Sequence, residues 1–391
     1  MRDVVATKGM CPWWQPPVPS GGSCQRRAVG SASVTVTLAQ LRRYAVGRTL
    51  FRPTTLPRAI ERLGFVQADP IRQPARAQDL ILRHRVSGYL AGDLERRYAK
   101  LPIEEDAFIN YGYLPRATAA LMHPREARRQ WDEATRARAE AVLEFVRERG
   151  AVHPREVEDH FQHGRVKNWF GGNSNASTQL LDGLHYRGML RVVSRASGTR
   201  TYAVADRPLV PIDPDGALAQ LLDVAIRLYA PLPRRTLRQL GSLLGYGAPQ
   251  WRDRRIEGLL LAEERHASAT VGGVQWFWPA DEDPTARLTP KPVVRLLAPF
   301  DPIVWDRYRF ELFWGWDYKF EAYTPAAQRV RGYYSLPLLW RDKVVGWANV
   351  SVVSGALVAD IGYVSGPPSE PAFASALEAE LAAMGTFLGL C

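Results

Sequence analysis

The spacing of apolar residues divides the chain into a helical part and a strand-rich part. Apolar positions recur at helical spacing between residues 38 and 261, as in the predicted helix 127–149, where Val142 and Val146 mark the inward face. After residue 292 the segments become aromatic and alternating, which predicts strands. We therefore predict an α+β fold. The predicted C-terminal strands span residues 293–297, 330–338, 343–353 and 356–363, and the predicted helices there span 306–314 and 371–388.

The order of predicted elements repeats along the chain. Residues 126–208 and 209–285 each contain three predicted helices and then a two-stranded hairpin, which is typical of a winged helix-turn-helix. Residues 34–125 fit a modified first copy, so we predict tandem winged helices followed by a small β-sheet or barrel domain. The predicted domains are a disordered N-terminal extension (1–33), a first winged-helix-like domain (34–125), a second (126–208) and a third winged helix (209–285), and a C-terminal β-rich domain with a closing helix (286–391).

An amide and a carboxylate stand two residues apart just before a proline, at Gln67 and Asp69. In an extended chain, side chains at i and i+2 point the same way, and Pro70 keeps Asp69 out of the α region. We therefore expect Gln67 and Asp69 to face one side and Ala68 the other. Such a pair can orient a water molecule and stabilise a developing positive charge. The alternative is turn chemistry, in which Asp69 accepts backbone N–H bonds.

The chain carries a net charge of +11, from 51 Lys and Arg against 40 Asp and Glu, and arginine greatly outnumbers lysine. Guanidinium groups bind phosphates through paired hydrogen bonds, which favours a polyanionic partner such as double-stranded DNA. A GC-rich genome could also enrich arginine, but it explains the net sign less easily. Each basic residue that is a candidate for contact with the phosphate backbone could instead be a solvated surface residue. The candidates are Arg72, Arg76, Arg83, Arg85, Arg165 and Lys167.

Cysteines and apolar runs indicate a cytoplasmic protein without a membrane anchor. The three cysteines, Cys11, Cys24 and Cys391, form neither a disulfide framework nor a metal-binding spacing. No apolar run reaches transmembrane length, and residues 1–33 lack the features of a signal peptide. His160 and His163 could share a helix face near His153 and Glu156. Because no cysteine or convincing third ligand accompanies them, we predict no metal site.

Four stretches resemble the crosslink-repair DNA glycosylases of the YcaQ/AlkZ type. They are Gly-Phe-Val-Gln-Ala-Asp at 64–69, Trp-Phe-Gly-Gly-Asn-Ser at 169–174, residues 297–307 around Ala-Pro-Phe-Asp-Pro, and residues 313–337 ending in Gly-Tyr-Tyr-Ser-Leu-Pro. The resemblance implies tandem winged helices with a C-terminal β domain. It also implies that Gln67 and Asp69 are the catalytic pair, in the Gln-x-Asp form of the YcaQ branch. Members of that branch resemble excisers of cationic N7-alkylated purines and unhookers of interstrand crosslinks.

The sequence departs from this family beside the predicted lesion pocket. Many members carry a His-Glu pair where Ile109 and Asn110 stand here, so an ionisable pair is missing from the pocket rim. We assign Asn110, Tyr111 and Tyr113 to this pocket. The two tyrosines could stack on a lesion, or they could be core aromatics.

The resemblance implies a metal-independent, monofunctional DNA glycosylase that acts as a monomer without a cofactor. A cationic purine is already a good leaving group, so Asp69 would stabilise the sugar cation and orient a water molecule that Gln67 helps to hold. No lysine lies in the motif, so no Schiff base is expected. The pattern alone leaves open whether the base is flipped out of the duplex. A non-catalytic winged-helix DNA-binding protein or regulator is the alternative, and a ligand-binding or structural role is the third.

Overall fold

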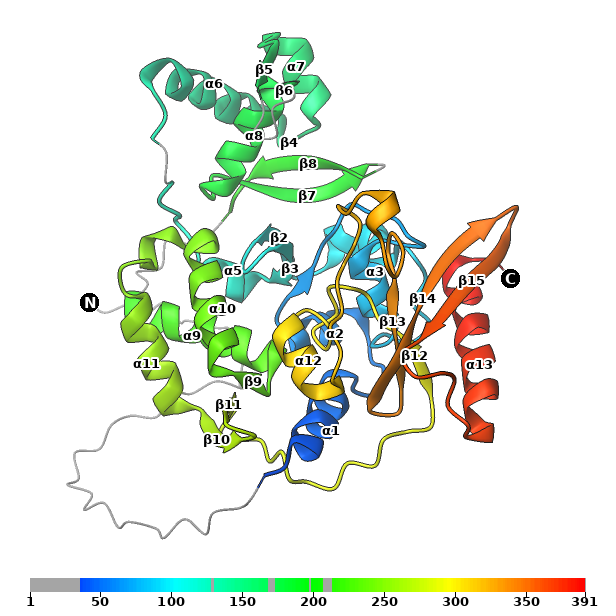
Figure 1. Ribbon diagram of the computed structural model, residues 1–391. Coiled ribbons are helices and arrows are strands. Elements are labelled where there is room, and N and C mark those ends of the chain that lie inside the picture. Colours follow the sequence, from blue (N-terminus) through cyan, green and yellow to red (C-terminus); the bar gives the residue numbers. More distant parts are fainter. Residues whose placement is uncertain (1–35, 128–129, 168–172, 197, 207–212, 391) are drawn as a thin grey trace, which may run out of the picture. The chain divides into compact units, whose positions relative to one another are not determined.

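Three segments of the chain share one order of elements, and each closes into a small three-stranded antiparallel sheet (Figure 1). A helix leads into a short strand, two helices follow, and a hairpin completes the segment. In each sheet the short strand pairs with the second strand of the hairpin. This computed structural model describes residues 36–127, 130–167, 173–196, 198–206 and 213–390.

The first segment carries the Gln67–Asp69 motif. Thr37 caps the preceding helix α1 through a capping box with Gln40, and Gly64 ends α2 in the left-handed conformation. Strands β2 and β3 form the hairpin of this segment. The elements are α1 (Leu38–Thr49), α2 (Leu56–Leu63), β1 (Val66–Gln67), α3 (Ala77–Leu82), α4 (Asp93–Arg97), a 3₁₀ turn (Tyr98–Lys100), β2 (Ile103–Ala107), β3 (Tyr111–Pro115) and α5 (Arg116–Ala120).

The second segment follows the same order and adds a short two-stranded ribbon, β5–β6. Its first helix begins at Glu133, later than the predicted residue 127, because the side chain of Asp132 caps it by accepting from the Thr135 amide. The elements are α6 (Glu133–Arg149), β4 (Ala151–Val152), α7 (Pro154–Phe161), β5 (Arg165–Lys167), β6 (Asn173–Asn175), α8 (Ala176–Tyr186), β7 (Leu190–Ala196) and β8 (Thr199–Val204).

The third segment repeats the order with longer helices. Its last helix continues to Arg265, and the first strand of its hairpin begins at Ala267. The elements are α9 (Pro214–Tyr229), β9 (Leu232–Pro233), α10 (Arg234–Gly247), a 3₁₀ turn (Pro249–Trp251), α11 (Arg255–Arg265), β10 (Ala267–Val271) and β11 (Val274–Trp278).

The C-terminal part is a four-stranded antiparallel sheet in the order β12-β13-β14-β15, with α13 packed on β12. The predicted strand 330–338 is mostly wrong, because β13 begins at Leu336. The residues at the start of this predicted strand, Val330, Arg331 and Gly332, instead donate backbone N–H bonds to the buried carboxylate of Glu321. They form an irregular loop that these bonds close. The elements are β12 (Val294–Leu296), α12 (Arg307–Trp314), a 3₁₀ turn (Ala326–Gln328), β13 (Leu336–Trp340), β14 (Lys343–Val353), β15 (Ala356–Tyr363) and α13 (Pro371–Leu388).

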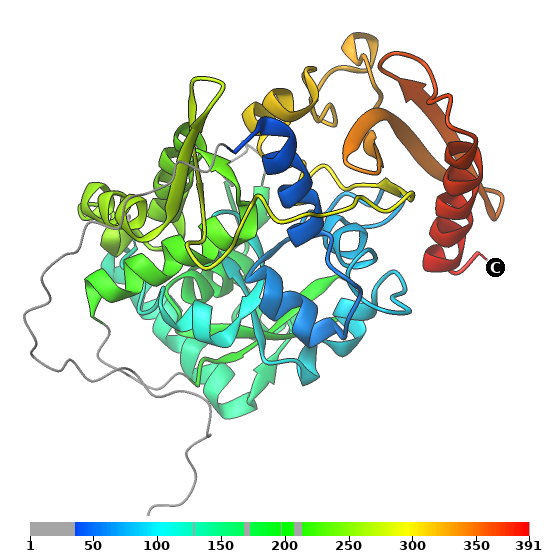
Figure 2. The same ribbon diagram turned by 90° about the horizontal axis from the view of Figure 1, so that it is seen from below.

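Contacts distant in sequence join these parts. One cluster of buried apolar side chains extends from Phe51 to Phe387, and helix α1 packs against α12 (Figures 1 and 2). The mixture of helices and small antiparallel sheets agrees with the predicted α+β class. Among the helices described here, none has the length and apolar character needed to cross a membrane.

Candidate active site

Strand β1 fixes the backbone that carries Gln67 and Asp69. Gln67 lies opposite Gly112 of β3, and the amide of Ala68 donates to the carbonyl of Tyr111 over 2.9 Å. A Cβ atom at Gly112 would lie 2.4 Å from the carbonyl oxygen of Val66, so only glycine allows this close approach. The motif is therefore held at the junction between a short strand and the following helical region.

Asp69 is partly buried and takes part in a turn. Its Oδ1 accepts a 2.9 Å bond from the amide of Ile71, and its own amide donates to Oε1 of Gln78 over 3.4 Å. Burial raises the pKa of the Asp69 carboxyl, and the bond from Ile71 opposes that rise only in part. The alternative role predicted for Asp69, accepting a backbone N–H bond in a turn, is therefore present. That bond occupies only Oδ1 of the Asp69 carboxylate.

Gln67 is 3% exposed, and its Oε1 is buried without a hydrogen-bond partner among the described residues. Gln67 and Asp69 line one cleft, as the spacing predicts. The expectation for Ala68 is wrong in part, because Ala68 also borders the cleft. The strand pairing of β1 ends at Gln67, so strict alternation does not extend to Ala68.

The cleft around Asp69 has a volume of about 720 Å³ and draws its walls from three parts of the chain. We call it the Asp69 cleft. The first segment supplies its floor, the β7–β8 hairpin with the neighbouring helices supplies one wall, and the C-terminal part supplies aromatic side chains. Its lining includes Gln67, Asp69, Arg76, Asn110, Tyr111, Asp182, Arg195, Gly198, Arg200, Phe300, Phe320 and Tyr323.

A buried carboxylate, Glu105, organises one side of the cleft. It accepts 2.7 Å bonds from the hydroxyl of Tyr111 and Nε of Arg195, and a 3.1 Å bond from Nε of Arg200. Burial alone would raise the pKa of Glu105, but the bonds and charges of the two arginines outweigh burial and lower the pKa. Arg200 also lies over the Tyr111 ring at 4.3 Å and pairs with Asp182 at 2.9 Å.

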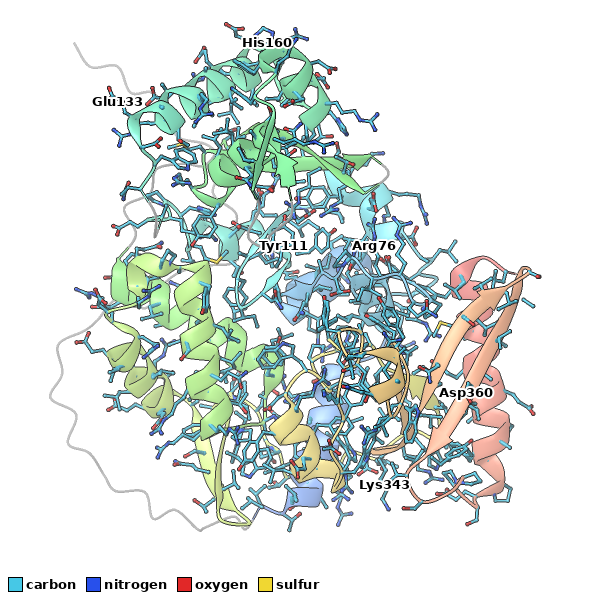
Figure 3. All side chains as sticks on the ribbon, turned by 45° about the horizontal axis from the view of Figure 1, so that its top comes forward. Arg76, Tyr111, Glu133, His160, Lys343 and Asp360 are labelled. Carbon is cyan, nitrogen blue, oxygen red and sulfur yellow. The ribbon has the colours of Figure 1, made fainter. Side chains whose placement is uncertain are left out.

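Arg76 meets the turn between β7 and β8. It pairs with Glu95, whose other oxygen accepts from the amide of Gly198 over 3.0 Å. A Cβ atom at Gly198 would lie 2.6 Å from the Arg76 guanidinium, and the φ of Gly198 is +88°. Figure 3 labels Arg76 and Tyr111, which lie next to this hairpin. Arg72 is exposed near the same turn.

The structure corrects the DNA-contact prediction for two of the six basic residues. Arg85 is fully buried and forms bonds of 2.8 and 2.9 Å with the carboxylate of Asp301. Arg83 is 4% exposed and pairs with Glu380 at 2.7 Å. Both guanidinium groups are thus used inside the protein, where they cannot reach a DNA backbone.

The remaining basic candidates differ in how far they are described. Arg165 is exposed on β5. Lys167 ends that strand, but its side chain lies outside the described part of the structure, as do the Trp-Phe-Gly-Gly residues at 169–172. Of the predicted basic residues whose side chains the structure describes, Arg76 alone lines the cleft.

The three predicted lesion-pocket residues separate into two groups. Asn110 and Tyr111 line the Asp69 cleft, Asn110 being exposed at its rim. Tyr113 is 1% exposed and packs edge-on against Tyr98 with ring centroids 5.8 Å apart, so it is a core aromatic and its assignment to the pocket is wrong. Ile109, where many relatives carry the His of the His-Glu pair, is also buried.

Tyr334 does not line the Asp69 cleft but packs behind its wall, and sequence reasoning did not assign it to the site. Its hydroxyl is buried without a hydrogen-bond partner among the described residues, and its ring packs edge-on against Phe320 of the cleft wall at 5.2 Å. Burial raises the pKa of Tyr334, and the negative charge of Asp69 raises it further. The two side chains are therefore within electrostatic range. The signal in the sequence is the Gly-Tyr-Tyr-Ser-Leu-Pro stretch, which carries part of the family resemblance.

The histidines that the sequence offered as metal ligands have other roles. His153 caps α7, His160 stacks on Phe145 at 4.6 Å, and Nδ1 of His163 lies 3.1 Å from the Ser177 hydroxyl. Within the described ranges, no group of three or more His, Cys, Asp or Glu side chains is arranged to hold a metal ion.

Comparisons with known proteins relate the chain to one family and one fold. The model of a family described as "DNA glycosylase AlkZ-like" matches residues 60–387. Among solved structures, the fold is similar to that of the Streptomyces sahachiroi DNA glycosylase AlkZ, with a TM-score of 0.60 and 16% sequence identity. That match covers 90% of this chain and 97% of the other chain. At this identity, the structural likeness concerns the fold.

Proposed function

This chain belongs to the AlkZ-like family of DNA glycosylases, and from that premise we propose that it hydrolyses the N-glycosidic bond of N7-alkylated, cationic purines in duplex DNA. The observation that carries the proposal is the placement of Gln67 and Asp69 side by side in the wall of a 720 Å³ cleft. A carboxylate in such a cleft can stabilise a sugar cation more strongly than water does, because less solvent surrounds it.

In the proposed reaction, the bond between C1′ and the purine nitrogen breaks, and its electron pair neutralises the cationic base. Asp69 stabilises the resulting charge on the sugar and orients a water molecule, whose oxygen then bonds to C1′. The proton released from this water passes to the Asp69 carboxylate. The unpartnered Oε1 of Gln67 supports a role as second acceptor for the same water molecule.

Tyr334 completes this proposed arrangement as a positioning residue. Its buried hydroxyl has no hydrogen-bond partner among the described residues, and burial together with the charge of Asp69 raises its pKa. A water molecule that donates to Asp69 and Gln67 retains two lone pairs. One can accept from the Tyr334 hydroxyl, which leaves the other free to attack C1′.

For DNA binding, we propose that the three repeated segments are winged helices, within domains 34–125, 126–208 and 209–285, ahead of the C-terminal domain 286–391. Their order of a helix, a short strand, two helices and a hairpin supports this assignment. Arg72, Arg76 and Arg165, with Lys167, are the proposed phosphate contacts. We further propose that the protein acts as a monomer, in the bacterial cytoplasm, without a metal or cofactor.

The substrate range is also a proposal. The Asp69 cleft is bordered by Asn110 where many relatives carry a glutamate, so no carboxylate from that position repels or binds a lesion. The aromatic side chains Phe300, Phe320 and Tyr323 offer flat surfaces to a bulky alkylated base. We propose that the range includes interstrand crosslinks joined through N7 of guanine.

The test is base release from a duplex that carries N7-methylguanine, with the wild type compared with Asp69→Asn. We expect the substitution to lower the rate by about a hundredfold or more. Asp182→Asn is the matched control, because Asp182 lines the same cleft but is already paired with Arg200 and Tyr202. Release by both variants at the wild-type rate would contradict the assignment of Asp69.

A second duplex with a nitrogen-mustard crosslink separates a narrow substrate range from a lack of activity. If wild type binds both duplexes in a salt-sensitive manner but releases no base from either, the protein is a non-catalytic DNA-binding member of its family. Treatment with borohydride during the reaction should trap no covalent adduct, because the proposed mechanism has no Schiff base.

A further inference from the structure

A second cavity, of about 230 Å³, lies between helix α1, the segment before β12 and the turn between β13 and β14. It shares no lining residue with the Asp69 cleft. We call it the cationic cavity, because every charged residue in its lining is positive. These residues are Arg43, Arg52, Lys291, Arg295 and Arg341. They come from separate segments that the fold brings together, and α1 and the strand β12 can be followed in Figures 1 and 2.

The charges in this cavity are poorly compensated. Arg295 projects from β12, and its guanidinium forms no hydrogen bond or ion pair within the part of the chain that the structure describes. Burial lowers the pKa of Arg295, and the nearby charges of Glu380 and Asp301 oppose that shift only in part, so the protein stabilises this charge less well than water would. Arg341 pairs with Glu370 at 2.7 Å, but its Nε is buried without a partner among the described residues.

Like charges gathered around a cavity repel one another and raise the local concentration of anions. A bound anion would offset that repulsion. It would also accept hydrogen bonds from the N–H groups of Arg295 and Arg341 that have no partner among the described residues. Guanidinium groups match phosphate oxygens in geometry, and a cavity below the usual 300–1,000 Å³ of ligand pockets suits a small group. We propose that the cationic cavity is a phosphate-binding site, distinct from the Asp69 cleft.

The phosphate could come from the DNA backbone or from free phosphate in solution. A phosphate from either source would accept from the same N–H donors. Only for a DNA phosphate should a substitution in the cavity change how strongly the protein binds duplex DNA. The proposal does not depend on base release, so the glycosylase assignment and this site can fail separately.

The experiment measures thermal unfolding of the full chain in inorganic phosphate and in chloride at equal ionic strength. Phosphate should raise the unfolding midpoint of the wild type with a saturable dependence on concentration. Lys291→Gln and Arg295→Gln should each weaken phosphate binding by at least roughly tenfold, since each removes a charge-assisted contact. Lys291 is exposed, so its substitution tests the site even if Arg295→Gln impairs folding.

Arg238→Gln is the control, because Arg238 is an exposed arginine on α10 outside the cavity and should retain the full phosphate response. General stabilisation by phosphate salts would affect the control and the cavity variants alike. An equal response in all variants, or a wild-type response no larger than that to chloride, overturns the proposal.

A duplex-binding titration then distinguishes the two sources. If the site holds a DNA phosphate, Lys291→Gln should reduce the slope of log affinity against log salt by about 1, and free phosphate should compete with duplex. If the site holds free phosphate, the salt slope stays at its wild-type value while the phosphate response is lost. Both results support a phosphate site.

Discussion

The guanidinium of Arg85 forms two hydrogen bonds, of 2.8 and 2.9 Å, with the carboxylate of Asp301, and neither side chain is exposed to solvent. The same guanidinium donates to the carbonyls of Thr49 and Ile81 over 3.0 and 2.7 Å. Asp301 in turn accepts from the amide of Ile303. One buried pair thus joins the end of the α3 region to the loop that carries Phe300 of the cleft wall.

Breaking this pair should destabilise the protein by about 3–5 kcal/mol, because the remaining charge would be buried without compensation. Arg85→Met and Asp301→Asn should each lower the free energy of unfolding measured in urea. Arg155→Met is the control, since Arg155 is an exposed arginine on α7. If Arg85 contacted DNA instead, its substitution would leave stability unchanged and reduce the salt dependence of duplex binding.

The Arg85–Asp301 pair also illustrates what sequence can predict in this chain. Local features follow from neighbouring residues. The predicted strand 343–353 is confirmed as β14, and the cap at Thr37 and the end of α2 at Gly64 agree with the ordinary preferences of threonine and glycine. The role of Arg85 depends on Asp301, a residue 216 positions away. The sequence around Arg85 therefore could not distinguish it from a surface arginine. Tyr113 was ambiguous for the same reason, since its burial against Tyr98 depends on how the hairpin packs.

One part of the site was predictable from local sequence and the other part was not. The Gln67–Asp69 pair could be found because extended geometry places both side chains toward one side, and the structure places both in the cleft wall. The aromatic wall and Tyr334 could not be derived that way, because they approach the motif only when the C-terminal part packs beside the first segment. The catalytic role of the pair remains a prediction.

Activity should decline in acid as Asp69 becomes protonated. Only the ionised carboxylate can stabilise a sugar cation, and burial raises its pKa above the ordinary value of 3.8. The midpoint of the acidic limb of kcat/KM should therefore lie above 3.8, measured as base release over a series of buffers at constant ionic strength. A limb centred at or below that value would contradict Asp69 as the titrating group.

The same shift predicts that Asp69→Asn is more stable than the wild type at neutral pH. Because the folded pKa is raised, ionised Asp69 lowers the stability of the folded state, and this penalty is complete above the raised pKa and absent below the ordinary one. Asparagine can still accept from the Ile71 amide without carrying a charge. Urea unfolding should show that Asp69→Asn is more stable than the wild type at neutral pH but not in acid. Equal stability of the two proteins at both pH values would contradict this prediction.

Arg72 should contribute to DNA affinity without reading sequence. It is exposed beside the β7–β8 turn, near Arg76 and the mouth of the Asp69 cleft. Arg72→Ala should weaken binding to unrelated duplexes to a similar extent and reduce the salt slope by about 1. Arg58→Ala, which removes an exposed arginine from α2, is the comparison. A loss confined to one sequence would indicate base contact instead.

Tyr334→Phe should slow base release while leaving the fold intact. A hydrogen bond that assists an ionised group contributes about 1.5–3 kcal/mol, so kcat should fall by roughly 10–100-fold with little change in KM. The Tyr334 hydroxyl has no hydrogen-bond partner among the described residues, so its removal breaks no bond within that part of the protein and stability in urea should not fall. The matched control is Tyr318→Phe, because the Tyr318 hydroxyl is also buried but donates to the Ser335 carbonyl over 2.7 Å.

The pH profile distinguishes a positioning role for Tyr334 from a structural one. If its hydroxyl supports the charge of Asp69 through the bound water, removal of that hydroxyl should raise the pKa of Asp69 and move the acidic limb of kcat/KM to higher pH. Tyr318→Phe should instead lose about 0.5–1.5 kcal/mol of stability and keep the wild-type pH profile. An unshifted profile and full activity in Tyr334→Phe would mean that its buried hydroxyl takes no part in positioning the water beside Asp69.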